Sequence, residues 1–423
     1  MVDLSNLGLS IQTTLAPEPP KALPAGPLGF GKYLTDHVLI SEHTPEQGWG
    51  DIKIQPRQSV SVDLAAGALQ YGLSIFEGLK AYRQKDDRLM LFRPDAHARR
   101  FALSAERLCM PRFDEARLVA ALRAFTRVEK DMIPSVERGS LYLRPVLFAI
   151  DEYLGVRPGN RHLLAILASP VEFYFSQDAR PLRLWAEREL TRCAPGGMGA
   201  AKTGGNYAAS LLAAQKAKQG GYDQVLWLDA LEHRYLEEVG TMNLFISLKS
   251  GVVTPPTDGT ILKGVTRDSC LTLLREWGVP VQERRITLDE LSEAAGSGEL
   301  LEIFGTGTAA LVAPVGDVSW SGGQKVSPSG GPLAERLKEA LTAIHRGEAK
   351  DTHGWVQPVG GMRASLVSLR TRSRTRTPAR DPRPPAGTRV LAAWASLIGS
   401  RTGSGRVPLL ARSELTRIFR PTA

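Results

Sequence analysis

Cysteine is scarce in this sequence and widely spaced. The 423 residues contain three cysteines, Cys109, Cys193 and Cys270, and no Cys-x-x-Cys pair. An odd number at this spacing excludes a fully paired disulfide framework and argues against a zinc site. We therefore expect three buried thiols, a reducing compartment and no metal ion.

Long apolar runs are absent too. No segment approaches the roughly 18 consecutive apolar residues that a membrane helix needs. The N-terminus shows no basic region followed by an apolar one, and the first arginine is Arg57. We therefore expect a cytoplasmic protein that has no membrane partner.

Lysine is missing from residues 360–423, which hold 13 arginines, two acids and a net charge of +11. The whole chain has a formal net charge of +9, so the first 359 residues carry −2. The basic segment has no sustained apolar period and is not expected to fold alone. One interpretation is a basic arm for nucleic acid or membrane. We favour the other, shifted-frame or read-through translation of GC-rich DNA, which encodes arginine more readily than lysine, and we expect no nucleic-acid partner.

The length of 423 residues and the hydrophobic share of 43% predict two domains. Residues 1–25 are proline-rich and predict an extended arm. A smaller α/β domain is expected over residues 26–171 and a larger one over residues 182–359. Residues 172–181 mix aromatic and polar side chains without a clear period, which is typical of a linker. Residues 360–423 remain as an extension.

Hydrophobic periodicity and turn residues predict the individual elements. Strands are expected over residues 33–40, 52–62, 141–150, 162–171, 224–228, 244–248, 252–254 and 300–304. Helices are expected over residues 94–109, 115–128, 206–219, 266–277 and 332–345. Pro56 makes the run at 52–62 an edge strand or two pieces. Thr266 is a candidate helix cap, and Thr287 with Glu290 forms a capping-box pattern.

Lys202 is the residue that most strongly indicates chemistry. It lies in the segment GGMGAAKTGGNY, whose glycines allow tight turns and a close approach of the backbone to a ligand. The apolar helix over residues 207–214 indicates partial burial. Burial lowers the proton affinity of an ammonium, as a lysine that forms an imine requires. A solvated lysine without a role is the alternative.

A P-loop is a second interpretation of the same segment. The pattern G-x-x-x-x-G-K-[ST] is nearly met from Gly196 to Thr203, and the apolar run VLWLD ends at Asp229 like the strand that supports magnesium. Position 201 is alanine where the motif needs glycine. Two glycines then follow at once, where a helix should continue. These departures argue against a nucleotide-hydrolysing site.

Longer motifs connect Lys202 with a known family. The segments AKTGGNYAASL, YLEEVGTMNLF, GTILKGVTRDS and FGTGTAALVAPV resemble, in order and spacing, those of the branched-chain amino acid aminotransferases. Upstream, QYGLSIFEGLKAYR, LFRPDAHARRF and YLRPVL resemble the same family, and HGWVQPV at 353–359 is similar to its usual C-terminus. The resemblance covers residues 28–359 and leaves the extension unmatched.

The resemblance implies an α/β (α+β), two-domain protein of pyridoxal phosphate fold type IV, similar to D-amino acid aminotransferase. It implies pyridoxal 5'-phosphate at the domain interface and reversible transfer of the amino group of leucine, isoleucine or valine to 2-oxoglutarate, giving branched-chain 2-oxo acids and glutamate. A homodimer is implied, in which the Tyr71 loop reaches the neighbouring site. D-amino acid aminotransferase and aminodeoxychorismate lyase are alternative enzymes. A cofactor-binding protein without turnover and a basic-tailed nucleic-acid binder are alternatives of another kind.

The resemblance also assigns residues to the reactive part of the cofactor. Lys202 forms the imine with the cofactor and moves the proton on the substrate α-carbon. Tyr207 donates a hydrogen bond to the phenolate oxygen. Glu238, with Glu237 as the adjacent alternative, faces the pyridine nitrogen and keeps it protonated, so that the ring accepts electrons.

A further group of residues is assigned to the cofactor phosphate. Arg100 matches the phosphate arginine of the family, with Arg99 as the alternative one position away. Val265 and Thr266 lie at a predicted helix N-terminus, where backbone amides bind anions. Thr308 follows a Gly-Thr-Gly turn and is implied as a second phosphate contact.

The substrate is assigned a mainly aromatic wall, which consists of Phe30, Tyr71, Phe76, Tyr142 and Tyr174. Ala309 is implied to offer its amide to the substrate carboxylate. Arg144 lies two residues beyond Tyr142, on the same face of a strand. It serves either the second carboxylate of glutamate or the contact between the domains. Ala310 and Ala313 stand where some relatives carry a redox Cys-x-x-Cys, so we expect no such switch.

Overall fold

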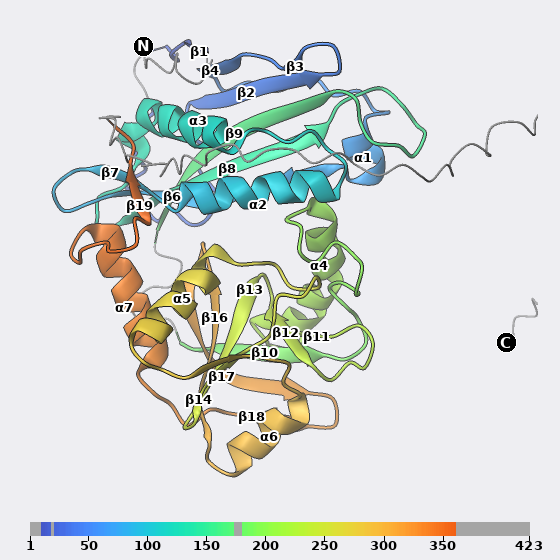
Figure 1. Cartoon of the computed structure of the whole chain (residues 1–423), viewed down its shortest axis with the longest axis vertical. Helices are drawn as coiled ribbons and strands as arrows, with labels where there is room; N and C mark the ends of the chain where they lie inside the picture. The colour runs from blue at the N-terminus through green and yellow to red at the C-terminus, as the bar shows by residue number, and fades with distance from the viewer. Residues whose placement is uncertain (1–9, 18–20, 173–179, 361–423) are drawn as a thin grey trace, which may run out of the picture. The chain divides into compact units, whose positions relative to one another are not determined.

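The computed structural model describes residues 10–17, 21–172 and 180–360 of the chain. Most of the expected linker at 172–181 and nearly all of the expected extension at 360–423 lie outside the described residues, as do parts of the N-terminal arm. Two β-sheets with their helices make up the described part (Figure 1).

The first sheet has ten strands: β1 (Ile11–Thr13), β2 (His37–Thr44), β3 (Gly48–Trp49), β4 (Ile52–Pro56), β5 (Ser74–Phe76), β6 (Leu79–Arg83), β7 (Leu89–Phe92), β8 (Gly139–Ala149), β9 (His162–Glu172) and β19 (Val356–Pro358). Their order is β1-β4-β2-β9-β8-β6-β7-β19, with β3 beside β2 and β5 beside β8. The strands expected at 141–150 and 162–171 are therefore the central pair, and they run antiparallel over their full length.

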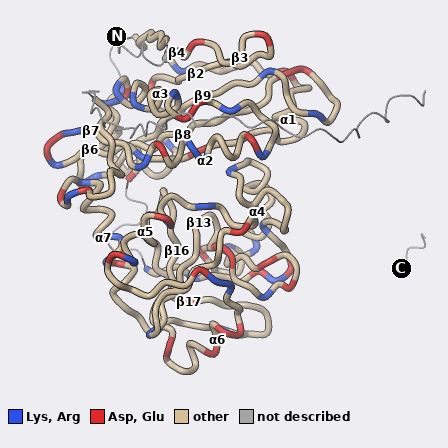
Figure 2. Tube along the Cα trace, viewed as in Figure 1, with Lys and Arg blue, Asp and Glu red and all other residues tan. Residues whose placement is uncertain are grey.

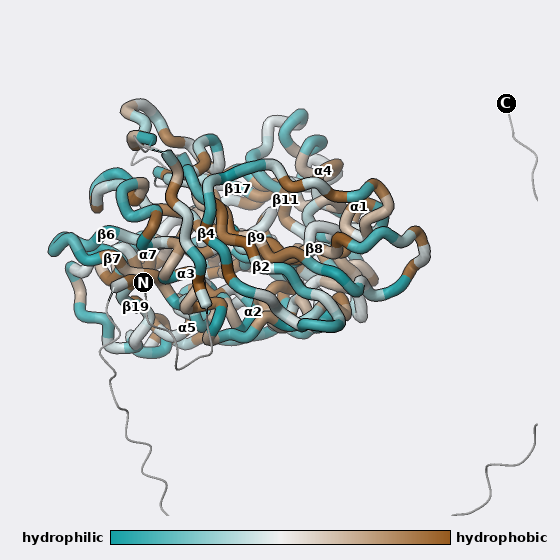
Figure 3. The backbone as a smooth tube through the Cα atoms, turned by 90° about the horizontal axis from the view of Figure 1, so that it is seen from above, coloured by the Kyte–Doolittle hydropathy of each residue, from teal (hydrophilic) through white to brown (hydrophobic). Residues whose placement is uncertain are grey.

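Helices α2 (Pro94–Arg107) and α3 (Glu115–Val128) pack against each other beside this sheet (Figure 1). A short helix, α1 (Gly67–Tyr71), and a 3-10 turn at Lys130–Met132 complete this part. Figure 3 shows a hydrophobic stretch along β9. The helices and central strands share one apolar core, whose fully buried members include Phe101, Phe125, Leu143 and Ile166.

The second sheet has nine strands: β10 (Leu182–Glu187), β11 (Gln224–Leu228), β12 (Leu236–Val239), β13 (Met242–Leu248), β14 (Gly251–Thr254), β15 (Val281–Glu283), β16 (Leu300–Gly307), β17 (Leu311–Trp320) and β18 (Gln324–Val326). Their order is β12-β11-β10-β17-β16-β13-β14-β15, with β18 beside β17. Because β12 also pairs with β13, six of the strands form a closed circuit. One apolar core collects side chains from every strand of this circuit.

Four helices pack on the second sheet: α4 (Gly204–Gln219), α5 (Val265–Glu276), α6 (Leu288–Gly296) and α7 (Leu333–Arg346). Helices α5 and α7 share a core with Phe245 and Phe304, whose stacked ring centroids are 5.2 Å apart. Helix α4 packs on β11 through the buried Ala213 and Ala217. Helix α6 joins the core inside the strand circuit. These packings fix the N-terminal ends of α4 and α5, both of which reach the site described below.

Several sequence predictions match the structure at the level of residues. Helix α3 and strand β11 have the predicted bounds, and the strands expected at 244–248 and 252–254 lie in the antiparallel pair of β13 and β14. Thr287 caps α6, because its hydroxyl accepts a hydrogen bond from the amide of Glu290. The prediction of Thr266 as a cap was wrong. Helix α5 begins at Val265 with Gly264 as its N-cap, so Thr266 lies inside the first turn.

Other predictions need correction. Strand β2 begins at His37 instead of residue 33, and β4, which ends at Pro56, lies between β1 and β2 instead of at the sheet edge. Strands β10, β12 and β17 of the closed circuit are missing from the prediction. Cys193 and Cys270 are buried, but Cys109 is exposed because it follows α2 with a left-handed backbone, φ 54°, that ends the helix and turns the chain.

Charged residues of both signs alternate along the helices and loops of the described part (Figure 2). Among the described residues, no helix is long and apolar enough to cross a membrane. The same residues contain no group of three or more histidine, cysteine or acidic side chains arranged to hold a metal ion.

Candidate active site

A cavity of about 390 Å³ is lined by residues of both sheets and by the N-terminal ends of α4 and α5. Tyr71, which the resemblance assigns to the neighbouring site of a homodimer, does not line it. Tyr71 lies on α1, where its hydroxyl donates to the carbonyl of Leu154. Tyr174 lies outside the described residues. The other nominated residues all line the cavity: Phe30, Phe76, Arg100, Tyr142, Arg144, Lys202, Tyr207, Glu238, Val265, Thr266, Thr308 and Ala309.

Lys202 lies just before α4, and its backbone is hydrogen-bonded to helix α2 and to strand β5 of the first sheet. Its amide donates to Ser104 Oγ at 2.9 Å, and its carbonyl accepts from the amide of Phe76 at 3.0 Å. The Nζ donates to Tyr207 Oη at 2.7 Å. Burial, with Arg100 nearby, lowers the pKa of Lys202 to about 8. A lysine with this pKa gives up its proton easily near neutral pH, as imine formation requires.

Tyr207 lies in the first turn of α4 and packs edge-on against Phe76, with ring centroids 4.8 Å apart. Burial and the nearby Glu238 carboxylate raise the pKa of Tyr207 to about 12. Tyr207 therefore remains a neutral phenol at physiological pH. Its hydroxyl accepts from Lys202 and keeps its own proton to donate to an anionic oxygen.

Glu238 reaches the cavity from β12. Its Oε1 accepts from the side-chain amide of Asn243 at 3.0 Å, and its Oε2 lies 2.5 Å from Arg192 Nη2. Among the described residues, none gives Oε2 a well-directed hydrogen bond. Burial raises the pKa of the Glu238 carboxyl, whereas Arg192 and Lys202 act in the opposite direction. Oε2 thus has room for one more donor. Arg192 itself lies outside the sequence motifs, and only the fold brings it here.

The structure also separates the two pairs of adjacent alternatives. Glu237 lies on the other face of β12, where it accepts from Thr260 Oγ1 at 2.7 Å and lines a separate small cavity. Arg99 is exposed on α2, whereas Arg100 is buried and lines the main cavity. Of each pair, therefore, Glu238 and Arg100 are the members that can reach a bound cofactor.

Arg100 is held by a fully buried carboxylate, Glu77, that the sequence analysis did not nominate. Nε and Nη2 of Arg100 donate to Glu77 at 2.6 and 2.9 Å, and Nη1 donates to the Lys263 carbonyl at 3.0 Å. His97 Nδ1 lies 2.8 Å from the same carboxylate. Burial alone raises the pKa of Glu77, but Arg100 and His97 outweigh it and hold that pKa far below its usual range. The guanidinium is thereby fixed in one orientation in the cavity wall.

We expect Glu77→Gln to destabilise the protein by about 3 kcal/mol, because it leaves a buried guanidinium without its counter-charge. The difference in unfolding free energy between the variant and wild type should have its full value above pH 4.5 and shrink as the pH falls. The reason is that Glu77, whose pKa is lowered in the folded protein, stabilises the fold only while its carboxylate is ionised. Urea unfolding at several pH values measures this. Glu335→Gln on α7, where the pair with Lys338 is exposed at 3.6 Å, is the control and should change stability by less than about 0.5 kcal/mol. An equal effect of both substitutions would contradict the role of Glu77.

Two backbone turns in the cavity wall suit a phosphate. No side chain caps α5, so the amides of its first turn remain available to an anion at the positive end of the helix. A Cβ at Gly264 would lie 1.9 Å from Asn243 Oδ1, so this close approach of the turn to β13 requires glycine. On β16, Thr306 Oγ1 is buried and has no hydrogen-bond partner among the described residues. Thr308 follows in the turn after β16.

Aromatic side chains and one arginine form the remaining wall. The rings of Phe30 and Tyr142 meet edge-on at 4.8 Å. Arg144 donates from Nη2 to Tyr142 Oη at 3.0 Å, and its Cζ lies 4.7 Å from the centroid of the Phe76 ring. Stacking on an aromatic face holds the guanidinium while leaving its edge for an anion. This part of the wall therefore combines apolar surface with the guanidinium of Arg144.

The arrangement of these residues fits pyridoxal phosphate. An amine of lowered pKa stands beside a neutral phenol, and a buried carboxylate oxygen still accepts one donor. A positive helix end and a fixed guanidinium provide two phosphate contacts in the same cavity. An aldehyde, a pyridine nitrogen and a phosphate are the three groups that such a set can bind together.

Comparison with known proteins decides the family. The family model of amino-transferase class IV matches residues 74–318. The chain belongs to the class IV aminotransferases. Branched-chain-amino-acid aminotransferase 2 of Bacillus subtilis is 42% identical over 340 residues, which are 80% of this chain and 94% of that protein. The branched-chain-amino-acid aminotransferase of Mycolicibacterium smegmatis is 44% identical over 335 residues, 78% of this chain and 91% of that protein.

Solved structures of class IV relatives share the fold. The branched-chain amino acid aminotransferase of Escherichia coli has a TM-score of 0.63 at 28% identity and covers 77% of this chain and 99% of its own. The T.th. branched-chain amino acid aminotransferase, solved with pyridoxamine 5'-phosphate, has a TM-score of 0.62 at 30% identity and covers 76% of this chain and 98% of its own. The α/β (α+β) class IV fold expected from the sequence motifs is thereby confirmed.

Proposed function

We infer that this class IV aminotransferase moves the amino group of leucine, isoleucine or valine to 2-oxoglutarate, with pyridoxal 5'-phosphate as its cofactor. The observation that carries the inference is the position of Lys202 Nζ, 2.7 Å from Tyr207 Oη, in one cavity with Glu238 and Arg100. The branched-chain relatives support the substrate class. The T.th. structure with pyridoxamine 5'-phosphate supports the cofactor.

When bound, the cofactor supplies an electron sink for the negative charge that develops at the substrate α-carbon. Lys202 would attach the cofactor covalently, and its amine, once released, would take up and return the α-proton because its pKa is lowered. Arg100, the N-terminus of α5 and Thr308 would hold the phosphate. Glu238 would hold a proton on the pyridine nitrogen. Tyr207 would donate to the phenolate oxygen and orient the Lys202 amine.

The substrate lies against the aromatic wall. Phe30, Phe76 and Tyr142 accommodate a branched aliphatic side chain and exclude water from it. Ala309, in the turn after β16, offers its amide to the α-carboxylate. Arg144 provides a cation for the second carboxylate when glutamate or 2-oxoglutarate occupies the same place.

Turnover with a panel of amino donors tests this function. Purified protein with cofactor receives 2-oxoglutarate and either leucine, isoleucine, valine, aspartate or D-leucine, and glutamate formation is followed. The three branched donors should react, and aspartate should react at least about 100-fold more slowly, because an apolar wall offers no compensation for burying a carboxylate. Preference for D-leucine, or no reaction with any donor, would contradict the proposal.

Arg144→Met should impair the glutamate half-reaction by about 100-fold and the leucine half-reaction by less than about 5-fold. The physical reason is that only glutamate brings a second carboxylate to the guanidinium, and a charged hydrogen bond is worth roughly 1.5–3 kcal/mol. Single-turnover rates with each amino acid measure the two losses. Arg188→Met, an exposed position after β10, is the matched control. Equal loss for both substrates would assign Arg144 to structure instead.

We further propose that the enzyme is cytoplasmic and that it is a homodimer, as the sequence motifs imply. The α1 segment carries an exposed apolar patch that supports an interface, because contiguous patches of this kind mark association surfaces. The Ala66–Glu152 bridge and the Tyr71–Leu154 hydrogen bond join α1 to the loop after β8. The exposed members of the patch are Leu64, Leu69, Tyr71, Tyr153, Leu154 and Val156.

The double substitution Leu154→Glu and Val156→Glu should raise the dimer dissociation constant by at least about 10-fold, because it would bury two carboxylates against an apolar partner. Light scattering over a dilution series measures the change. Leu231→Glu, at a position 72% exposed between β11 and β12, introduces the same charge elsewhere and should leave the assembly unchanged. A monomeric wild-type protein would contradict the dimer proposal.

A further inference from the structure

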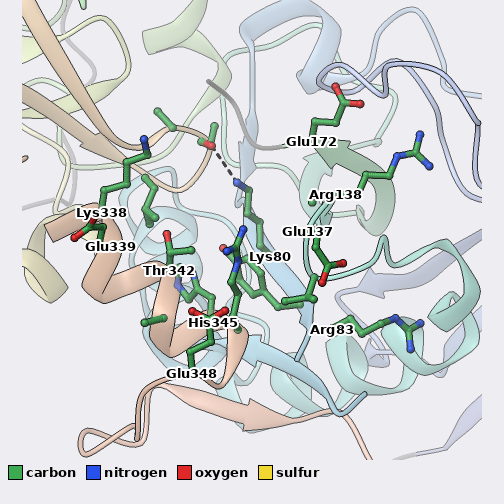
Figure 4. Close-up of a pocket in the computed structure, with 18 of the residues that line it drawn as sticks. Lys80, Arg83, Glu137, Arg138, Glu172, Lys338, Glu339, Thr342, His345 and Glu348 are labelled. Carbon is green, nitrogen blue, oxygen red and sulfur yellow. Dashed lines mark hydrogen bonds between the residues drawn. The ribbon is translucent and has the colours of Figure 1, made fainter. Parts of the chain in front are cut away.

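A second cavity, of about 1020 Å³, lies beside the first, and its wall includes a buried lysine (Figure 4). Ala309 and Ala310 line both cavities, so the turn after β16 stands between them. Lys80, on β6, reaches this turn from the side of the second cavity (Figure 4). Lys80 is not among the residues that we assign to the cofactor or the substrate, yet it contacts the turn that we propose as the carboxylate site.

Lys80 is only 6% exposed, and its Nζ donates to the Ala309 carbonyl at 3.0 Å. Among the described residues, it forms no ion pair. Burial lowers the pKa of Lys80 to about 8. The neighbouring His345 is neutral, because burial and Lys80 itself lower its pKa to about 3. An ammonium buried without a carboxylate is costly. The hydrogen bond from its Nζ joins β6 to a turn 229 positions away in the sequence.

The turn that Lys80 holds is strained and needs support. Leu311, the first residue of β17, has a φ of 62°, in the left-handed region that bulky side chains rarely adopt. Such a conformation persists only where the surrounding structure determines it. A trans peptide is planar, so a bond to the Ala309 carbonyl also fixes the direction of the Ala310 N–H. The contact therefore fixes the peptide between Ala309 and Ala310 directly, and the Ala309 N–H, which belongs to the preceding peptide, only through the shared Cα.

Lys80 also lies close to the aromatic wall of the site. It is paired with Tyr142 across the antiparallel strands β6 and β8, so the two side chains leave the sheet on the same face. Tyr142 lines the candidate active site, and Lys80 lines the second cavity on the other side of the turn. A positive charge in this place favours an anion held by the turn amides, because attraction between charges is stronger away from water.

We propose that Lys80 is a positioning residue for the substrate α-carboxylate, which anchors the Ala309 carbonyl so that the turn after β16 presents its amides to that carboxylate. The inference rests on the proposed function, because it takes the Ala309 turn as the carboxylate site. Lys80 touches neither substrate nor cofactor. It acts through the peptide that it holds.

The test uses the full chain loaded with cofactor and the variants Lys80→Met, Lys80→Arg and Lys338→Met. Lys338 lines the same second cavity from α7, where its Nζ pairs with Glu335 at 3.6 Å, so its variant removes the same charge from another side of the cavity. The probe is 4-methylvalerate, which has the carbon skeleton of leucine and a carboxylate but no amino group. Its dissociation constant is measured by calorimetry, beside that of the neutral 4-methylvaleramide.

Lys80→Met should weaken 4-methylvalerate binding by 10-fold to about 100-fold, in the range of one lost charge-assisted contact. It should change binding of the amide by less than about 3-fold, raise KM for leucine more than it lowers kcat, and leave cofactor content unchanged. Lys80→Arg should restore binding to within about 3-fold of wild type, and Lys338→Met should match wild type. Wild-type affinity for 4-methylvalerate in Lys80→Met, or equal losses for acid and amide, would overturn the role of Lys80.

Different results would contradict the proposed function and the proposed role of Lys80. A wild-type protein that neither binds 4-methylvalerate nor reacts with leucine would overturn the proposed function, whatever the variants do. A wild-type protein active with leucine, together with normal 4-methylvalerate binding in Lys80→Met, would overturn the role of Lys80 and leave the proposed function intact. Loss of cofactor from Lys80→Met but not from Lys80→Arg would assign Lys80 to cofactor retention and likewise overturn its role at the carboxylate.

Discussion

Lys202→Ala should lower the rate of leucine transamination by about 10⁴-fold or more, because one side chain supplies both the covalent attachment and the proton carrier. The lowered pKa of Lys202 allows its amine to be free of its proton near neutral pH, and alanine offers neither amine nor proton. The cofactor should still bind, since Arg100, Thr308 and the N-terminus of α5 remain in place. Retention without covalent attachment is therefore the signature of this variant.

Three measurements separate these effects. Equilibrium dialysis reports whether the cofactor is retained, and mass spectrometry after borohydride reduction reports whether it is covalently attached. Single-turnover kinetics with leucine report the chemical step. Lys216→Ala, an exposed lysine on α4, is the matched control and should be indistinguishable from wild type. Covalent attachment of the cofactor in Lys202→Ala would refute the assignment of Lys202.

Many of the helix and strand bounds that the sequence predicts correctly depend on residues next to those bounds. Helix α3 has its predicted bounds because Asp114 caps it by accepting from the amide of Arg117, and because its apolar residues repeat at the helical period. Thr287 marks the start of α6 in the same local way. Both signals lie within a few residues of the element that they define. They need no knowledge of the rest of the fold.

The candidate site was indicated by motifs, yet its supporting contacts were not. Glu77 lies inside one of the motifs, but its partner Arg100 is 23 positions away and only the packing of α2 on the first sheet brings them together. The contacts of Arg192 with Glu238, and of Lys80 with Ala309, span still longer separations. A single sequence contains no signal for such pairs, because each residue alone has the pattern of an ordinary solvated charge.

Cys109 shows the converse. It was expected in the core, but the chain leaves α2 in a left-handed turn at that residue. Here a local backbone turn overrides what residue type alone predicts. The closed strand circuit was missed for a different reason, because the pairing of β12 with β13 completes a ring of strands that no local pattern defines.

Glu238→Gln should slow the leucine half-reaction by about 100-fold or more while the cofactor stays covalently attached to Lys202. The substitution keeps the size of the side chain and its hydrogen bond with Asn243, but it removes the negative charge that holds a proton on the pyridine nitrogen. Loss of one preorganised electrostatic partner costs about 10²–10³ in rate. Single-turnover kinetics measure the loss, and the ¹⁵N chemical shift of labelled cofactor reports the proton on its ring nitrogen.

Glu237→Gln is the matched control, because it makes the same chemical change one residue away on the opposite face of β12. We expect its rate to stay within about 3-fold of wild type and its ring nitrogen to remain protonated.

The contact of Glu238 with Arg192 means that Glu238→Gln also affects stability, and this effect must be separated from the effect on rate. In Glu238→Gln a buried guanidinium loses its carboxylate at 2.5 Å, so stability should fall as well, and the rates must be compared at equal folded and cofactor-loaded fractions. An unslowed Glu238→Gln with a protonated ring nitrogen would move the pyridine contact to Glu237 or to no carboxylate at all. A slow Glu238→Gln variant whose ring nitrogen has lost its proton would show that the Glu238 carboxylate, by keeping that nitrogen protonated, sets the rate of reaction at the α-carbon.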